Sequence, residues 1–174
     1  NTGIIRNIDI KLSNFPSLSN VNLSGILSLD GVGNLFFIGS EFAYRLNLSS
    51  GEATPVAGNK KFNLVGDDIA AQFASIGSIK DILVDSNDVV YLADPVNRLV
   101  RKIDPNTQII STILGKDTSN TVDEGDGGLA INAIAVPEAL AITSTNKLLI
   151  ADNRFAVSSR IRQIDLNTGI ITTI

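Results

Sequence analysis

Short runs rich in hydrophobic residues alternate with clusters of Asp, Asn, Ser, Pro and Gly along this chain. Runs that end at turn-forming residues are typical of β-strands joined by tight hairpins. Residues 160–164 alternate with period two, which indicates a strand with one packed and one wetter side. Only residues 68–76 could form a short helix, which Gly77 would end. The predicted strands are 81–85, 89–93, 99–103 and 109–114, followed by 140–142, 148–151, 160–164 and 170–174.

One short phrase recurs along the chain and sets its organisation. It reads Asn-Thr-Gly-Ile-Ile at residues 1–5 and again at 167–171, with diverged copies at 49–53 and 106–110. Ala-Asp pairs that end at Asp94 and Asp152 recur in the same order within the later units. Successive copies lie about 50 to 60 residues apart, and a fixed period of this length predicts a repeat architecture.

Four short strands per repeat are typical of a β-propeller blade, because each small sheet buries its faces only against its neighbours. We therefore predict an all-β fold of about three propeller blades, each a sheet of four antiparallel strands. The predicted units are a strand at 1–8 that completes another blade, a diverged blade at 9–58, and blades at 59–115 and 116–174. Closed propellers use about four to eight blades, so the chain is expected to be half of a six-bladed ring.

The sequence of the third unit, and less completely that of the second, is similar to a known repeat. The first unit is diverged, since it has no Gly-Asp-Gly-Gly loop and no Ala-Asp pair. This resemblance to the long form of the NHL repeat implies a propeller and says little about function. The segments that carry it are Gly125–Ala130, Val136–Ile142, Leu149–Asp152, Ile161–Asp165 and Thr168–Thr173, and in the second unit Gly66 through Gly115.

Composition excludes several function classes. The net charge is −4 at pH 7, which gives no long-range attraction for nucleic acid or anionic lipid. No apolar run approaches the roughly 18 residues of a membrane span, so we expect no membrane insertion. The basic pairs at 101–102 and 160–162 are interpreted as parts of solvated strand faces. Histidine and cysteine are absent, which disfavours triad hydrolases and imidazole or thiolate metal sites, and predicts that the chain is not an enzyme.

Several charged residues recur once per blade, so a role that every blade needs is favoured over one active site. The expected role is turn capping or ion pairing, and the alternative is a ligand or cation held near a central channel. A loop with three carboxylates, at Asp123, Glu124 and Asp126, is interpreted as a plain connection. Its alternative is a Ca²⁺ site; otherwise no cofactor is expected. The recurrent positions are Asp94 and Asp152, Arg101 and Arg162, and Asp104 and Asp165.

Two N-glycosylation sequons begin at Asn22 and Asn47. If either carries a glycan, the protein passes through a secretory route, and we expect a secreted or cell-surface protein. Phe36, Phe37 and Tyr44 cluster in the diverged unit and predict core packing, with a binding surface as the alternative.

Three blades cannot close a ring, so further blades in cis or identical chains in trans are the expected partners. The favoured hypothesis is a non-catalytic extracellular scaffold or adhesion module that contacts other proteins and can act as a subunit of a larger assembly or filament. The alternative is a ligand- or metal-binding propeller of the lyase or lactonase kind, with its active residues in blades outside this chain. An RNA-binding propeller would need a basic face, which the acidic balance disfavours.

Overall fold

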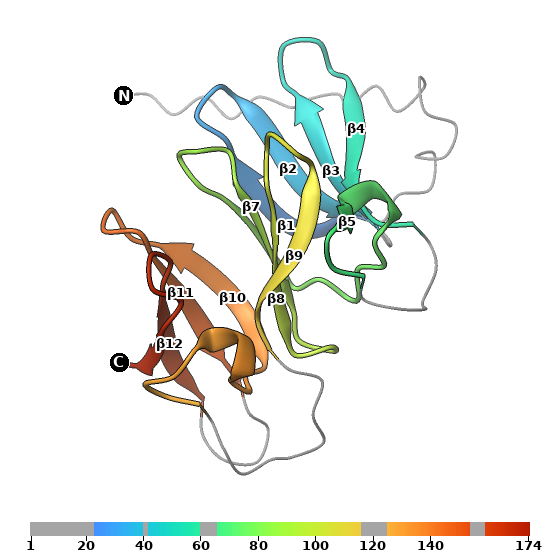
Figure 1. The fold of residues 1–174 in the computed structure, drawn as a ribbon. Helices are drawn as coiled ribbons and strands as arrows, with labels where there is room; N and C mark the ends of the chain where they lie inside the picture. Colours follow the sequence, from blue (N-terminus) through green and yellow to red (C-terminus); the bar gives the residue numbers. More distant parts are fainter. Residues whose placement is uncertain (1–22, 40–41, 60–65, 116–124, 154–158) are drawn as a thin grey trace.

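The computed structural model describes residues 23–39, 42–59, 66–115, 125–153 and 159–174. These residues form three antiparallel sheets, each with four main strands paired in chain order (Figure 1). The predicted fold class, all-β and built from propeller blades, is confirmed. The strand expected at 1–8 lies outside the described residues.

Each sheet is named here as a blade. Blade 1 comprises β1 (Leu23–Leu29), β2 (Asn34–Gly39), β3 (Phe42–Asn47) and β4 (Ala53–Ala57). Blade 2 comprises β6 (Asp81–Val84), β7 (Val90–Asp94), β8 (Leu99–Ile103) and β9 (Ile109–Leu114). Blade 3 comprises β10 (Pro137–Ile142), β11 (Lys147–Asp152), β12 (Arg160–Asp165) and β13 (Ile171–Thr173).

In blades 2 and 3, the segment that leads into the blade first runs along the outer edge of that same blade. In blade 2 this segment adds β5 (Ile69–Ala70), which pairs with β9, so the sheet has five strands instead of the expected four. In blade 3, Leu129 makes a single bridge to Ile170 at the matching place. A turn of 3-10 helix follows in each case, η3 (Ala71–Phe73) and η4 (Ala130–Asn132). The helix expected over 68–76 is reduced to η3, because β5 takes up the residues before it.

The repeated phrase marks the turn between the third and fourth strands of every blade. Gly51, Gln108 and Gly169 occupy the same place in it, with φ of 73°, 58° and 72°. A left-handed residue lets the chain reverse within the hairpin, and glycine adopts that conformation without a steric penalty. The first hairpins carry a second left-handed position, occupied by Gly33, Asp88 and Asn146.

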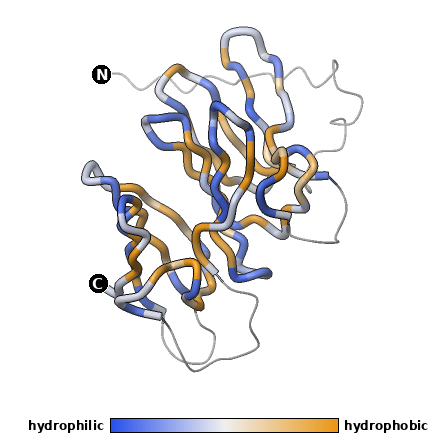
Figure 2. Tube along the Cα trace, in the orientation of Figure 1, coloured by the Kyte–Doolittle hydropathy of each residue, from blue (hydrophilic) through white to orange (hydrophobic). Residues whose placement is uncertain are grey.

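Most of the hydrophobic core lies between blades, and a smaller cluster lies on the outer face of blade 1. One cluster joins Phe36 and Ile38 of blade 1 to Ile82, Leu92 and other residues of blade 2. A second joins the opposite face of blade 2 to blade 3, through residues that include Tyr91, Val100, Leu148, Ile150 and Ile164. The hydropathy trace in Figure 2 shows that the strands are mostly hydrophobic and the turns mostly hydrophilic.

The first strands β1, β6 and β10 of the blades are neighbours, and polar contacts join them. The backbone N–H of Val84 donates to Ser28 Oγ at 3.0 Å, and the N–H of Leu140 donates to Asp81 Oδ2 at 2.6 Å. Burial raises the pKa of Asp81, although both of its backbone hydrogen bonds oppose the rise. Each blade is therefore joined to the next by a hydrophobic interface and a hydrogen bond near its first strand.

Gly115, just after β9, provides a test of this backbone geometry. Its φ is 107°, and a Cβ there would lie 2.2 Å from the carbonyl oxygen of Arg98. We expect Gly115→Ala to lower the free energy of unfolding by more than about 2 kcal/mol, measured by urea denaturation. The control Gly169→Ala has a positive φ but meets only Leu129 Cδ2 at 3.6 Å, so about 1 kcal/mol is expected. Equal losses would contradict the close approach at Gly115.

Candidate functional site

The arginine that recurs on the third strand of a blade is buried. Arg101 on β8 is 1% exposed. Its Nη2 donates to the carbonyl oxygen of Gly66 at 2.6 Å and to Asp67 Oδ1 at 2.8 Å. Thr112 on β9 donates its hydroxyl to the same Asp67 oxygen at 3.0 Å. The loop that enters blade 2 is thereby fixed to its third and fourth strands.

Blade 3 repeats this arrangement. Arg162, fully buried on β12, donates from Nε and Nη2 to Asp126 Oδ1 at 3.1 and 2.5 Å, and from Nη1 to the carbonyl oxygen of Ile134 at 2.9 Å. Thr173 donates its backbone N–H and its hydroxyl to Asp126 Oδ2 at 3.2 and 2.5 Å. The interpretation of 101–102 and 160–162 as solvated faces is therefore wrong for Arg101 and Arg162. A buried guanidinium is tolerated here because a carboxylate and a carbonyl oxygen replace water.

The ion pairs change the pKa of their members. Burial alone would raise the pKa of Asp126, but hydrogen bonds from Thr173 and Arg162, with the charge of Arg162, lower it below the usual aspartate value. Burial lowers the pKa of Arg101, and Asp67 opposes that shift. An arginine with a lowered pKa still remains charged at physiological pH.

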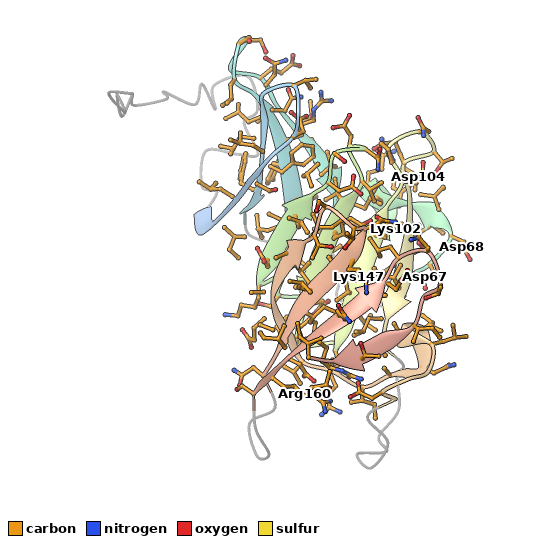
Figure 3. All side chains as sticks on the ribbon, turned by 90° about the vertical axis from the view of Figure 1, so that its left-hand side faces the viewer. Asp67, Asp68, Lys102, Asp104, Lys147 and Arg160 are labelled. Carbon is orange, nitrogen blue, oxygen red and sulfur yellow. The ribbon has the colours of Figure 1, made fainter. Side chains whose placement is uncertain are left out.

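The aspartates of the Ala-Asp pairs are buried at the ends of β7 and β11 and bind the backbone that precedes the first strand of their blade. Asp94 accepts the N–H of Gly77 at 3.1 Å and the N–H of Asn97 at 3.0 Å. Asp152 accepts the N–H of Val136 at 2.8 Å and Arg160 Nε at 3.0 Å. Figure 3 labels Asp67 and Arg160, which belong to these networks.

The third pair of recurrent aspartates caps the turn that the repeated phrase forms. Asp104 Oδ1 accepts the N–H groups of Asn106 and Thr107, and Asp165 Oδ1 accepts those of Asn167 and Thr168. The two backbone hydrogen bonds from Thr107 and Asn106 lower the pKa of Asp104. In blade 1 the same place is taken by Asn47, whose Oδ1 accepts the N–H groups of Ser49 and Ser50 at 2.9 Å each. The sequon asparagine is thus also a turn cap, and it is exposed.

The carboxylates considered for Ca²⁺ are only partly described. Asp123, Glu124 and the other sequon residue, Asn22, lie outside the described residues. Asp126 is described and pairs with Arg162. Within the described ranges, no group of three or more acidic, histidine or cysteine side chains could hold a metal ion.

The aromatic cluster of blade 1 is buried, as expected for core packing. Phe36 faces blade 2, whereas Phe37 and Tyr44 lie in a separate cluster on the opposite face. Their rings stack with centroids 5.2 Å apart. Tyr44 on β3 occupies the position that Arg101 and Arg162 hold in the other blades, so a stacked aromatic pair stands where those blades have an ion pair.

Both outer faces of the three-blade arc expose hydrophobic residues that the inner faces bury. On blade 3, Ile161 is 43% exposed, whereas Val100 at the matching place in blade 2 is fully buried against blade 3. On blade 1, Leu27 is 60% exposed, whereas the matching Ile82 is 2% exposed against blade 1. The exposed hydrophobic face of blade 3, formed by Ala139, Ala141, Ile161 and Ile174, is termed the open face below.

A pocket of about 370 Å³ lies where blades 2 and 3 meet. Sequence reasoning missed it, because its lining comes from turns and strands of both blades. It missed Asp67 as well. The available signal was that Asp67 and Asp126 recur with the repeat, as their arginine partners do.

The pairing of Arg162 with Asp126 predicts sensitivity to acid. Because folding lowers the pKa of Asp126, its ionised form stabilises the fold above its unfolded pKa of about 3.9. This contribution is lost as the pH falls through the lower folded pKa. We expect Asp126→Asn to lower the free energy of unfolding by about 1 kcal/mol near neutral pH, since the carboxylate is partly exposed.

Urea unfolding at several pH values measures this effect. The difference between wild type and Asp126→Asn should shrink between about pH 5 and pH 2, where the wild-type carboxyl becomes neutral. Glu52→Gln, at an exposed carboxylate of blade 1, is the control and should change little. A difference that stays constant down to pH 2 would contradict the charged pair.

No protein-family model matches the chain. The chloroplastic protein SUPPRESSOR OF QUENCHING 1 of Arabidopsis thaliana is 33% identical over 88 residues, which cover 51% of this chain and 8% of that protein. The match therefore spans a small part of this relative. Over the described ranges, no helix is long and apolar enough to cross a membrane.

Solved structures of similar fold are β-propellers. A protein of unknown function from Bacteroides thetaiotaomicron has a TM-score of 0.62 at 20% identity, over 86% of this chain and 34% of its own. A nidogen/laminin complex has a TM-score of 0.57 at 14% identity, over 84% of this chain and 46% of its own. A gluconolactonase from Xanthomonas campestris has a TM-score of 0.54 at 8% identity, over 86% of this chain and 46% of its own. The chain spans less than half of each, and the likeness shows a partial β-propeller.

Proposed function

We propose that this chain supplies three neighbouring blades of a closed β-propeller that serves as a non-catalytic extracellular scaffold for protein contacts. The observation that carries the proposal is the open face of blade 3. The same positions on blade 2 are buried by the next blade, so the open face has the character of a blade interface. Its natural cover is another blade, supplied by the same polypeptide or by a second copy.

The recurrent charged residues support the scaffold part of the proposal. Arg101 and Arg162, with Asp67 and Asp126, hold loops to strands within their own blades. Asp94, Asp152, Asp104 and Asp165 accept backbone N–H groups at strand ends and turns. Side chains engaged in this way stabilise the fold of each blade. Their recurrence in blades 2 and 3 follows from that need.

The nidogen/laminin complex is the comparison that fits a scaffold, since its name describes one protein bound to another. Assembly by this chain into a larger ring or filament would use the two outer faces of the arc. A secreted or cell-surface location is part of the same proposal and rests on the exposed sequon at Asn47.

Self-association of the 174-residue chain tests the open face. We expect the chain to associate at about 100 µM in sedimentation velocity, and Ile161→Lys to weaken association at least tenfold because a charge on this face must be desolvated. Val96→Lys is the control, since Val96 is 70% exposed on the turn between β7 and β8. A wild-type chain that stays monomeric at that concentration would contradict the proposal.

Glycosylation of Asn47 tests the proposed location. Peptide mapping of protein from its native source, with and without N-glycosidase, should show a glycan at Asn47. The matched variant is Asn47→Asp, which removes the sequon and keeps the turn cap that Asp104 and Asp165 provide in the other blades. Its Tm should stay within about 2 °C of that of the unglycosylated wild type. An unmodified Asn47 in native material would contradict the secretory route.

A further inference from the structure

The pocket between blades 2 and 3 has one end that is polar and a wall that is hydrophobic. Blade 2 contributes Asp85, Asn87 and Tyr91 from its first hairpin and Lys102 from β8. Ile113 of β9 and Ile164 of β12 line it from the two facing sheets. Its volume of about 370 Å³ falls in the range of small-molecule sites.

Blade 3 differs from blade 2 at the positions that form the wall. Leu129 and Ile131 stand on the segment around η4, where blade 2 has Ala70 and Gln72 around η3. Leu129 and Ile131 are both partly exposed in this pocket.

The turn capped by Asp165 continues the wall. Leu166 follows Asp165 where Pro105 follows Asp104 in blade 2, and Leu166 also lines the pocket. The repeat does not require large hydrophobic residues at these three places, because blade 2 forms the same turns with Ala70, Gln72 and Pro105. Their presence in blade 3 therefore points to something that covers them.

The acidic group in the pocket is already engaged by hydrogen bonds within its own blade. Asp85 Oδ1 accepts the N–H groups of Asn87 and Val89 at 2.8 and 3.0 Å, and Oδ2 accepts the hydroxyl of Tyr91 at 3.3 Å. Burial, together with the charge of Asp85, raises the pKa of Tyr91, so its phenol remains protonated and keeps this hydrogen bond. Asp85 thus acts as the cap of its own hairpin.

The cation in the pocket has no hydrogen-bonded partner, although its charge helps to lower the pKa of Asp104. Lys102 is half-buried and makes no hydrogen bond or ion pair with any residue that the structure describes. Figure 3 labels Lys102 on the side of the molecule that carries Asp104 and Lys147. At the place that corresponds to Lys102, blade 3 has Gln163. Blade 1 has Arg45 there, so blades 1 and 2 share a cation at this place and blade 3 lacks it.

We propose that this pocket binds a small organic carboxylate with a hydrophobic body. The body packs against Leu129, Ile131, Leu166 and Ile113, and the carboxylate pairs with the ammonium group of Lys102. The site is independent of ring closure, because both blades that form it are in this chain. It goes beyond the scaffold role, since a bound ligand would stabilise the contact between blades 2 and 3.

The test is titration of the full chain with 4-phenylbutyrate, followed by ¹H–¹⁵N NMR. Saturable shifts are expected at the pocket residues, and the neutral analogue 4-phenyl-1-butanol should bind about tenfold more weakly. Lys102→Gln, which copies Gln163 of blade 3, should remove the preference for the carboxylate. Ile131→Gln, which copies Gln72 of blade 2, should weaken both probes. Lys147→Gln is the control and should change neither.

Three outcomes would overturn the proposal. One is equal binding of the two probes by the wild type. Another is a preference for the carboxylate that survives Lys102→Gln. The third is shifts that map to the open face of blade 3 around Ile161, or that do not saturate at all. Each variant changes a side chain that is at least partly exposed, so folded protein is expected, and its NMR spectrum reports the fold directly.

Discussion

The structure depends on contact between small sheets whose faces cannot be buried by any single blade. A four-stranded sheet with strands of three to seven residues is too small to fold against itself. The two main clusters of buried residues therefore span blade boundaries, with one between blades 1 and 2 and one between blades 2 and 3. The same constraint explains why Ile161 and Leu27, at the two ends of the arc, remain exposed.

Much of the fold could be predicted because its signals are local. The turn phrase around Asn167 and Gly169 requires a cap and a left-handed residue at fixed positions, and both recur in all three described copies. Strand ends were predicted to within a few residues for the same reason. The short β5 was not predicted, because Ile69 and Ala70 carry no strand signal of their own and are ordered by pairing with β9.

The site was less predictable because its contacts join distant residues. Arg162 lies in a strand that alternates with period two, and the pattern suggests that arginine faces water while isoleucine packs. The reverse holds, because Asp126, 36 residues away in the chain, reaches Arg162, and Ile161 is left on the open face. The pocket depends on Lys102 and Leu129, which come from different blades, so only the assembled structure brings them together.

The placement of ion pairs within blades and of hydrophobic contacts between blades has an evolutionary consequence. The ion pairs of Arg101 with Asp67 and of Arg162 with Asp126 begin and end within one blade, whereas contacts across blade boundaries are mainly hydrophobic. A gene segment that encodes one blade therefore carries its own set of matched charges. Duplication or loss of such a segment would leave no buried ion without its counterpart, and the new junction would need only two hydrophobic surfaces of compatible shape.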